Sequence, residues 1–234
     1  MPSQANSPYR NQLLCALSRE DRAALVPHLE RRDFPIREVF ERPNRSIPYA
    51  YFIESGFASV VAADRENGIE VGLIGREGMS GLPIIMGTDR SPHSTYAQLA
   101  GSGYRIEAGV LREKIGRSAT LRALLLNFAH IFMVQATQTA LVNGRAAIGA
   151  RLARWILMGH DRINGDALIL THEFLAVMLG VRRAGVTEAL HILKRRGLIR
   201  ADRRNITIVD RAGLEATAGR SYGIPEAEYR RLFG

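Results

Sequence analysis

The pattern of hydrophobic positions changes its period near residue 118, which divides the chain into two kinds of predicted structure. Residues 35–110 hold short apolar runs of strand length separated by glycines and polar turn residues, and the clearest runs are residues 51–53, 58–61 and 71–74. The pair Asn67-Gly68, between two of these runs, favours the type I′ turn of a β-hairpin. This part of the chain therefore predicts a rolled or closed β-sheet.

From residue 118 onward, apolar side chains recur at helical spacing. One stripe advances by alternating steps of three and four residues, as in the seam of a coiled coil: Leu121, Leu124, Phe128, Ile131, Gln135, Gln138 and Val142. This pattern predicts a helix over residues 118–143 that joins two copies of the chain into a homodimer. The buried core helix of a monomer would show the same stripe, and its two glutamines do not decide between the interpretations.

Residues 171–196 predict two short helices joined by a tight turn. Thr171 is a candidate N-cap, Gly180 can supply left-handed backbone where the first helix ends, and the second helix begins near Arg182. The inward stripe of the second helix is Val186, Ala189, Leu190 and Leu193. This arrangement is typical of a helix-turn-helix, whose second helix enters the major groove of DNA.

The outward face of the second helix carries side chains that can contact bases or phosphates. Glu188 can accept a hydrogen bond from cytosine, Arg183 can pair with guanine, and Ala184 can touch a thymine methyl group. The predicted DNA-binding residues are Thr171, Arg182, Arg183, Ala184, Thr187, Glu188, His191, Lys194, Arg195, Arg203 and Arg204. Residues 197–200 and 206–209 predict two strands of a wing, joined by a basic turn. A solvated basic face that binds other proteins is the alternative interpretation.

The net charge of +9 is concentrated in the same part of the chain. Residues 1–143 hold 16 basic and 14 acidic side chains, whereas residues 144–234 hold 16 basic and 9 acidic ones. A local excess of cations indicates an anionic partner, and on a helix-turn-helix that partner is double-stranded DNA. No secretory signal is visible, and polar residues interrupt the apolar stretch 121–142, so a soluble cytoplasmic protein is expected.

The residues of this basic part resemble a known family. The segment LGVRRAGVTEALHILKRRGLI, followed by ITIVDRAGLE, and the β-rich segment FIESGFASVVAADRENGIEVGLIGREGMSGLP are similar to the Crp/Fnr superfamily of bacterial transcription regulators. The resemblance implies an α+β fold with a β-roll sensor over residues 1–117, a dimerisation helix over 118–143 and a winged helix-turn-helix over 144–234. It also implies a homodimer that reads an inverted repeat in DNA and can contact RNA polymerase.

The resemblance also locates a candidate effector pocket in the β-roll. By the family pattern, the ribose-binding Glu position holds Leu82 after the Gly81 turn, and the phosphate-binding Arg-Ser pair falls at His93-Ser94. Arg90 is the nearby cation that could replace the missing arginine. Since both charged contacts are missing, we expect no cyclic nucleotide and predict no cofactor. A sensor whose main function is to bind a cyclic nucleotide, or a haem through His93 or His130, is the alternative function.

The sequence offers little for an iron–sulfur cluster, a metal site or catalysis. The single cysteine, Cys15, cannot supply the four thiolates that an iron–sulfur cluster usually needs, and the six histidines show no paired spacing for a metal. The chain lacks the G-x-S-x-G, H-E-x-x-H and P-loop patterns, and the glycine-rich run 75–81 is better explained by corners of a β-roll. We therefore expect a binding protein and not an enzyme.

Overall fold

A computed structural model describes residues 7–64, 67–202 and 205–234. The chain forms two compact units that do not coincide with the three segments predicted from the sequence. Unit 1 comprises Met1–Val60, Ile74–Phe132 and Leu232–Gly234, and unit 2 comprises Val61–Leu73 and Met133–Arg231. The tip of a hairpin from the β-rich part is therefore grouped with the helix-turn-helix.

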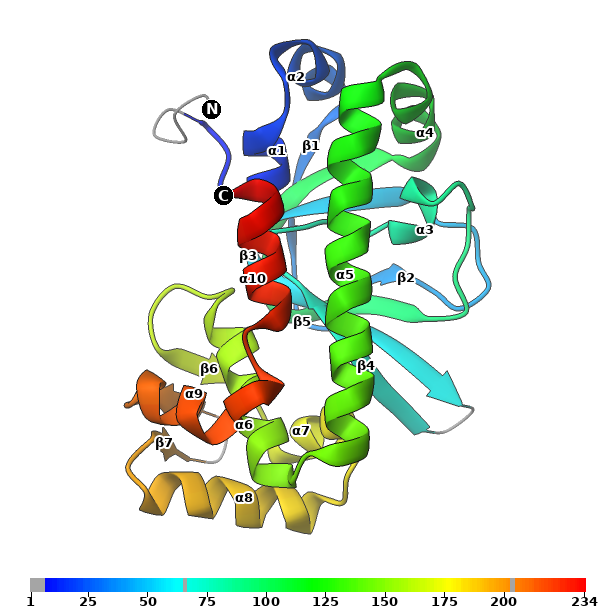
Figure 1. Ribbon diagram of the computed structural model, residues 1–234. Helices are drawn as coiled ribbons and strands as arrows, with labels where there is room; N and C mark the ends of the chain where they lie inside the picture. The colour runs from blue at the N-terminus through cyan, green and yellow to red at the C-terminus, as the bar shows by residue number, and fades with distance from the viewer. Residues whose placement is uncertain (1–6, 65–66, 203–204) are drawn as a thin grey trace. The chain divides into compact units, whose positions relative to one another are not determined.

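A five-stranded antiparallel sheet forms the centre of the β-rich part, in the order β1-β5-β3-β4, with β2 also paired to β5 (Figure 1). Its strands are β1 (Glu30–Phe34), β2 (Val39–Glu41), β3 (Tyr49–Asp64), β4 (Asn67–Ile74) and β5 (Ser94–Glu107). At Gly101, a β-carbon would lie 2.0 Å from the carbonyl oxygen of Ser55, so only glycine allows the neighbouring strand to pass this closely. The predicted sheet is confirmed.

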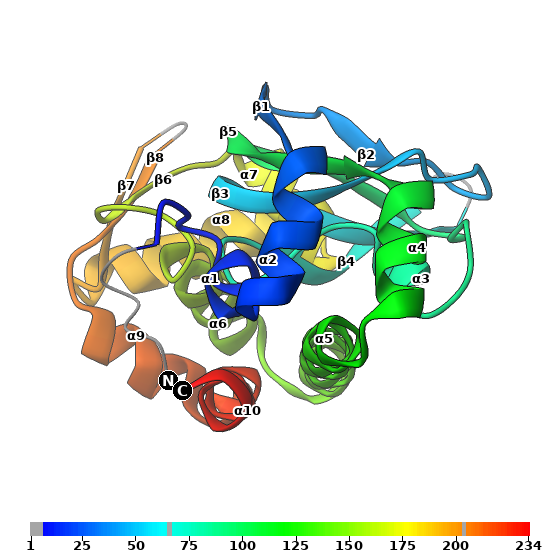
Figure 2. The same ribbon diagram turned by 90° about the horizontal axis from the view of Figure 1, so that it is seen from above.

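Short helices flank this sheet. They are α1 (Gln12–Ala16), α2 (Arg19–Leu25), η2 (Val26–His28), α3 (Leu82–Ile85) and α4 (Ala108–Arg117). Figure 2 shows α2 and α4 on the same side of the strands. The interior of the unit is apolar, and Phe52, Ile53, Phe57 and Met79 are fully buried in it.

The long helix α5 (Ala119–Arg145) begins one residue later and ends two residues later than predicted. Gly144 lies inside its last turn. The next helix, α6 (Ile148–His160), follows after only two residues. Among the described residues, α5 is the one helix long and apolar enough to cross a membrane by length and composition, a criterion that core helices also meet.

The elements after α6 form the predicted winged helix-turn-helix together with additions. They are β6 (Ala167–Ile169), α7 (His172–Leu179), α8 (Arg183–Arg195), β7 (Ile199–Ala201), β8 (Asn205–Ile208), α9 (Arg211–Ala218), η3 (Gly219–Ser221) and α10 (Ile224–Phe233). The wing is a three-stranded antiparallel sheet in the order β6-β8-β7. Strand β6 was not predicted, because three residues are too few to show a period.

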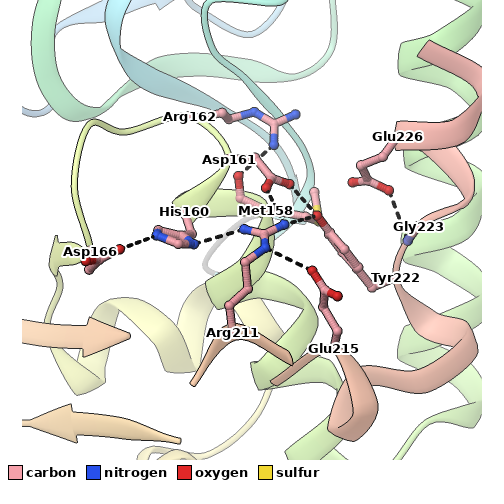
Figure 3. Close-up of polar contacts among 10 residues, drawn as sticks. All are labelled: Met158, His160, Asp161, Arg162, Asp166, Arg211, Glu215, Tyr222, Gly223 and Glu226. Atoms are coloured by element: carbon pink, nitrogen blue, oxygen red, sulfur yellow. Dashed lines mark hydrogen bonds and ion pairs between the residues drawn. The ribbon is translucent and has the colours of Figure 1, made fainter. Parts of the chain in front are cut away.

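A cluster of polar side chains links α6 to α9 and to the turn after η3 through hydrogen bonds and an ion pair (Figure 3). The guanidinium of Arg211 donates to Asp161, to the hydroxyl of Tyr222 and to His160 Nδ1. Because arginine can only donate, His160 accepts at Nδ1, and its proton lies on Nε2, which bonds Asp166 at 2.9 Å. Burial and the hydrogen bond to Asp161 raise the pKa of Tyr222 above its ordinary value. The cluster thus stabilises the junction with an ion pair and a neutral histidine.

Candidate nucleic-acid interface

The first helix of the helix-turn-helix has the predicted caps at both ends. Thr171 Oγ1 accepts a hydrogen bond from the backbone N–H of Phe174 at 3.2 Å, so the Thr171 hydroxyl is already used at the start of α7. Gly180 has φ +60° and ψ 41°, the left-handed conformation that glycine adopts without strain. The chain therefore turns sharply from α7 into α8, as the sequence predicted.

The recognition helix α8 buries the stripe that was expected to face inward. Val186, Ala189, Leu190 and Leu193 are all buried, and α8 packs against α6 and α7. Burial of one apolar stripe fixes the rotation of the helix about its axis. Consequently the opposite face is exposed, and it carries the following predicted DNA contacts: Arg182, Arg183, Ala184, Glu188, His191, Lys194 and Arg195.

Arg183 and Thr187, near the start of α8, already have protein partners. Arg183 Nη1 forms an ion pair with Glu173 Oε1 of α7 at 2.8 Å, and both side chains are more than half exposed. Such a pair is weak in water, so DNA can compete for the arginine. Thr187 is half-buried, and its hydroxyl donates to the carbonyl of Arg183 and contacts His172 Nδ1. Its hydroxyl is therefore less free to contact bases than the sequence suggested.

The wing lies close to the C-terminal half of α8. Lys194 Nζ donates to the carbonyl of Ala201 in β7 at 3.4 Å, and Asp202 accepts from the N–H of Asn205 across the wing turn. A hollow of about 220 Å³ lies between α8 and the wing, lined by His172, Leu190, His191, Lys194, Ala201 and Asp202. The predicted phosphate contacts Arg203 and Arg204 lie outside the described residues.

The candidate effector pocket of the β-roll is only partly brought together. Gly81 has φ +84° and precedes α3, and Leu82 is buried. Arg90, the predicted substitute cation, is 59% exposed and pairs with its neighbour Asp89 at 3.0 Å, so its charge is held at the surface. His93 and Ser94 are half-buried at the start of β5.

A buried carboxylate that the sequence analysis missed lies beside this turn. Glu41 of β2 is 5% exposed, and its Oε1 accepts from the N–H of Gly81 at 2.7 Å. Burial raises the pKa of Glu41, while the bonds from Gly81 and from the hydroxyl of Thr95 oppose that shift. Glu41 thereby links Gly81 to the residue that follows Ser94. A charged residue within the apolar strand Val39–Glu41 was the available signal.

The seam predicted for the dimer is mostly buried within the single chain, so that prediction needs correction. The buried members are Leu121, Phe128, Ile131, Gln135, Gln138 and Val142, and only Leu124 is half-buried. Phe128 packs over Gly78, where a β-carbon would lie 2.2 Å from the ring. Gln135 bonds both backbone groups of Leu73, and Gln138 donates to the carbonyl of Arg220. Steps of three and four residues describe any helix with one buried stripe.

A second stripe along α5 is exposed and has the same spacing. Its members advance by alternating steps of four and three residues and carry no formal charge: Ala119, Ala123, Leu126, His130, Met133, Thr137, Ala140 and Gly144. Leu126 and Met133 are 44% and 57% exposed. We call these eight residues the outer stripe of α5.

Comparisons with known proteins agree with this architecture. Residues 150–217 match the family model of the Crp-like helix-turn-helix domain. FixK2 from Bradyrhizobium japonicum is 16% identical, with a TM-score of 0.70 over 82% of this chain and 98% of its own. A CRP-family transcriptional regulator from Thermus thermophilus is 19% identical, with a TM-score of 0.67 over 80% and 96%. A comparison with curated proteins gave no match.

These likenesses cover both the β-rich part and the winged helix-turn-helix. At such low identity the solved structures establish the fold, while the family model identifies the helix-turn-helix domain itself. The chain therefore contains a Crp-like helix-turn-helix domain over residues 150–217 and shares the fold of these solved regulators.

Proposed function

We propose that the protein is a homodimeric, sequence-specific DNA-binding regulator that acts in the cytoplasm without catalytic activity. The observation that carries this proposal is the face of α8 opposite its buried stripe, which is exposed and holds cations beside a potential base-reading carboxylate, Glu188. Two such helices related by a two-fold axis would enter successive major grooves about 34 Å apart and read an inverted repeat. Contact with RNA polymerase is a further part of the proposal.

The side chains on this face are proposed to bind two different parts of DNA, the bases and the phosphates. Glu188, Arg183 and Ala184 are proposed to contact base edges, because they lie in the N-terminal half of α8. Arg182, Lys194 and Arg195 are proposed to bind phosphates, together with Arg203 and Arg204 of the wing turn. Phosphate contacts supply affinity and register, whereas base contacts supply specificity.

We propose that the outer stripe of α5 forms the dimer interface. The stripe is exposed, has heptad spacing and includes Leu126 and Met133. Burial of its apolar side chains against a second copy would stabilise the dimer. Its small residues, such as Ala123 and Ala140, would allow the two helices to approach closely. This replaces the inner seam suggested by the sequence pattern.

The β-roll is proposed to receive a signal other than a cyclic nucleotide, and no cofactor is proposed. The N–H of Gly81 is occupied by the Glu41 carboxylate, and a phosphate at this turn would lie against a buried acidic group. Cyclic AMP at millimolar concentration should therefore leave both the melting temperature and the DNA affinity unchanged, since a ligand that binds only the folded state raises the melting temperature. A clear upward shift would contradict this.

Selection from a library of randomised DNA duplexes tests the function. The protein should enrich an inverted repeat, and the logarithm of its affinity should fall linearly with the logarithm of the salt concentration. Arg195→Ala should make this slope shallower, whereas Arg231→Ala, which removes an exposed arginine of α10 paired with Glu228, should not. Enrichment of no sequence, or a slope equal for Arg195→Ala and wild type, would contradict the proposal.

A further inference from the structure

The tip of the β3–β4 hairpin is structurally part of the DNA-binding unit. Residues Val61–Leu73 are grouped with Met133–Arg231, although the two strands continue into the sheet of the β-roll. The hairpin is thus a covalent extension of the sensor part that reaches the helix-turn-helix. Its contacts within this unit involve the side chains of Ile69 and Glu70 and the backbone of Leu73.

The first contact is made at the turn between α7 and α8. A β-carbon at Gly180 would lie 2.9 Å from Cδ1 of Ile69, so the isoleucine side chain lies directly against the glycine backbone. Gly180 is the residue whose left-handed conformation sets the direction of α8. Any larger residue at Gly180 would displace Ile69.

The second contact is a buried hydrogen bond between the hairpin and α6. Trp155 Nε1 donates to Glu70 Oε1 at 2.6 Å, and the two residues are 3% and 4% exposed. The Trp155 ring also meets the Phe174 ring of α7 edge to face, with centroids 5.9 Å apart. The guanidinium of Arg154 is buried nearby and is attracted to Glu70. Trp155 therefore stands between the hairpin and the first helix of the helix-turn-helix.

The third contact ties the hairpin to α5. The side-chain amide of Gln135 accepts from the N–H of Leu73 at 2.6 Å and donates to its carbonyl at 3.2 Å, as a neighbouring strand would. All three contacts leave the outward face of α8 exposed, including Ala184, Glu188 and His191. The hairpin therefore does not block the surface that would meet DNA.

We propose that Ile69 and Glu70 are positioning residues, which hold the helix-turn-helix in a fixed orientation before it meets DNA. This inference rests on the proposed function. A dimer that reads two half-sites needs its recognition helices at a defined separation, and a helix-turn-helix that is held in advance loses less conformational freedom on binding. Loss of the hairpin contact should therefore weaken the preference for one half-site spacing more than it weakens the contacts within each half-site.

The test measures how strongly the full-length protein prefers its selected operator over the same operator with two base pairs inserted at the centre. Glu70→Ala should reduce this affinity ratio about tenfold, a typical coupling between sites. Glu70→Gln keeps an oxygen acceptor for the indole N–H and should retain most of the affinity ratio. Such a difference between Glu70→Gln and Glu70→Ala would show that the hydrogen bond sets the ratio, and not a general loss of folding. Glu113→Gln, which removes an exposed carboxylate of α4, is the control and should change nothing.

Trp155 is the only tryptophan of the chain, so its fluorescence reports on the contact directly. Glu70→Ala should shift the emission maximum of Trp155. Because Glu70 and Trp155 act through the same hydrogen bond, the double variant Glu70→Ala/Trp155→Phe should lower the affinity ratio no further than the more severe of the two single variants. Wild-type spacing discrimination in Glu70→Ala, or an unchanged emission spectrum, would overturn the inference. Failure of the wild-type protein to bind any inverted repeat would instead overturn the proposed function.

Discussion

The helices α5 and α8 have similar spacing of apolar residues but distribute polar side chains in opposite ways. The recognition helix α8 buries Val186 and Leu190 and exposes charged residues. In its second half, α5 buries Gln135, Gln138 and Thr139 and exposes Met133 and Leu141. A helix that turns polar groups inward and apolar groups outward has a surface suited to a protein partner, whereas α8 has a surface suited to an anionic one.

The comparison also shows why a stripe at helical spacing does not identify the surface it faces. The inner stripe of α5 was interpreted as a dimer seam because its residues recur at alternating steps of three and four, as in a coiled coil. In the structure those residues are mostly buried within the chain, where Phe128 packs over Gly78 and Gln135 bonds the backbone of Leu73, and the residues of the outer stripe are exposed. Substitutions in each stripe of α5 and on the outward face of α8 would show which surface binds a second copy and which binds DNA.

The largest effect is expected from a charge in the outer stripe. Met133→Asp would place two like charges at the proposed interface, and an uncompensated buried charge costs about 3–5 kcal/mol. Sedimentation velocity should show a monomer, and operator affinity should fall by more than about 100-fold. Met86→Asp, at a methionine that is also exposed but lies in the β-roll, is the matched control and should remain dimeric. If Met133→Asp remained as dimeric as the wild-type protein, the outer stripe would not be the interface, and the inner stripe would again be the candidate.

Gln135→Ala should affect stability and not association. It leaves the N–H and carbonyl of Leu73 without the partners that they have in the native chain, and an unsatisfied buried polar group costs about 1–3 kcal/mol. Thermal unfolding should occur at a lower temperature while the sedimentation coefficient stays that of the parent protein. Dissociation of the dimer at temperatures where the variant is folded would place Gln135 at the interface after all.

Much of the fold could be predicted because local signals determine it. Thr171 and Gly180 mark both ends of α7, and the stripe of α8 fixes its outward face, so the helix-turn-helix was found from the sequence. Glu41, Glu70 and the role of Gln135 could not be found, because their partners lie 40, 85 and 62 residues away. A charged residue in a strand pattern signals that a partner exists but does not say which one.

Glu188→Ala tests whether the outward face of α8 reads bases. Loss of its carboxylate should relax the preference at one base pair of each half-site by about 1–3 kcal/mol. Selection from randomised operators should show the loss at that position alone, since phosphate contacts do not read sequence. An identical base preference in variant and wild type would mean that α8 faces DNA through its cations only.

The smallest effect is expected at the ion pair that occupies Arg183. Glu173→Gln removes the charge that attracts Arg183 but keeps a side chain of similar size at the start of α7. Since exposed pairs contribute at most about 1 kcal/mol, stability should scarcely change, and operator affinity should rise by a few-fold because DNA no longer competes with Glu173. Titration at two salt concentrations measures this, and the gain should be larger at low salt. A loss of affinity would mean that the pair orients Arg183 for DNA and does not withhold it.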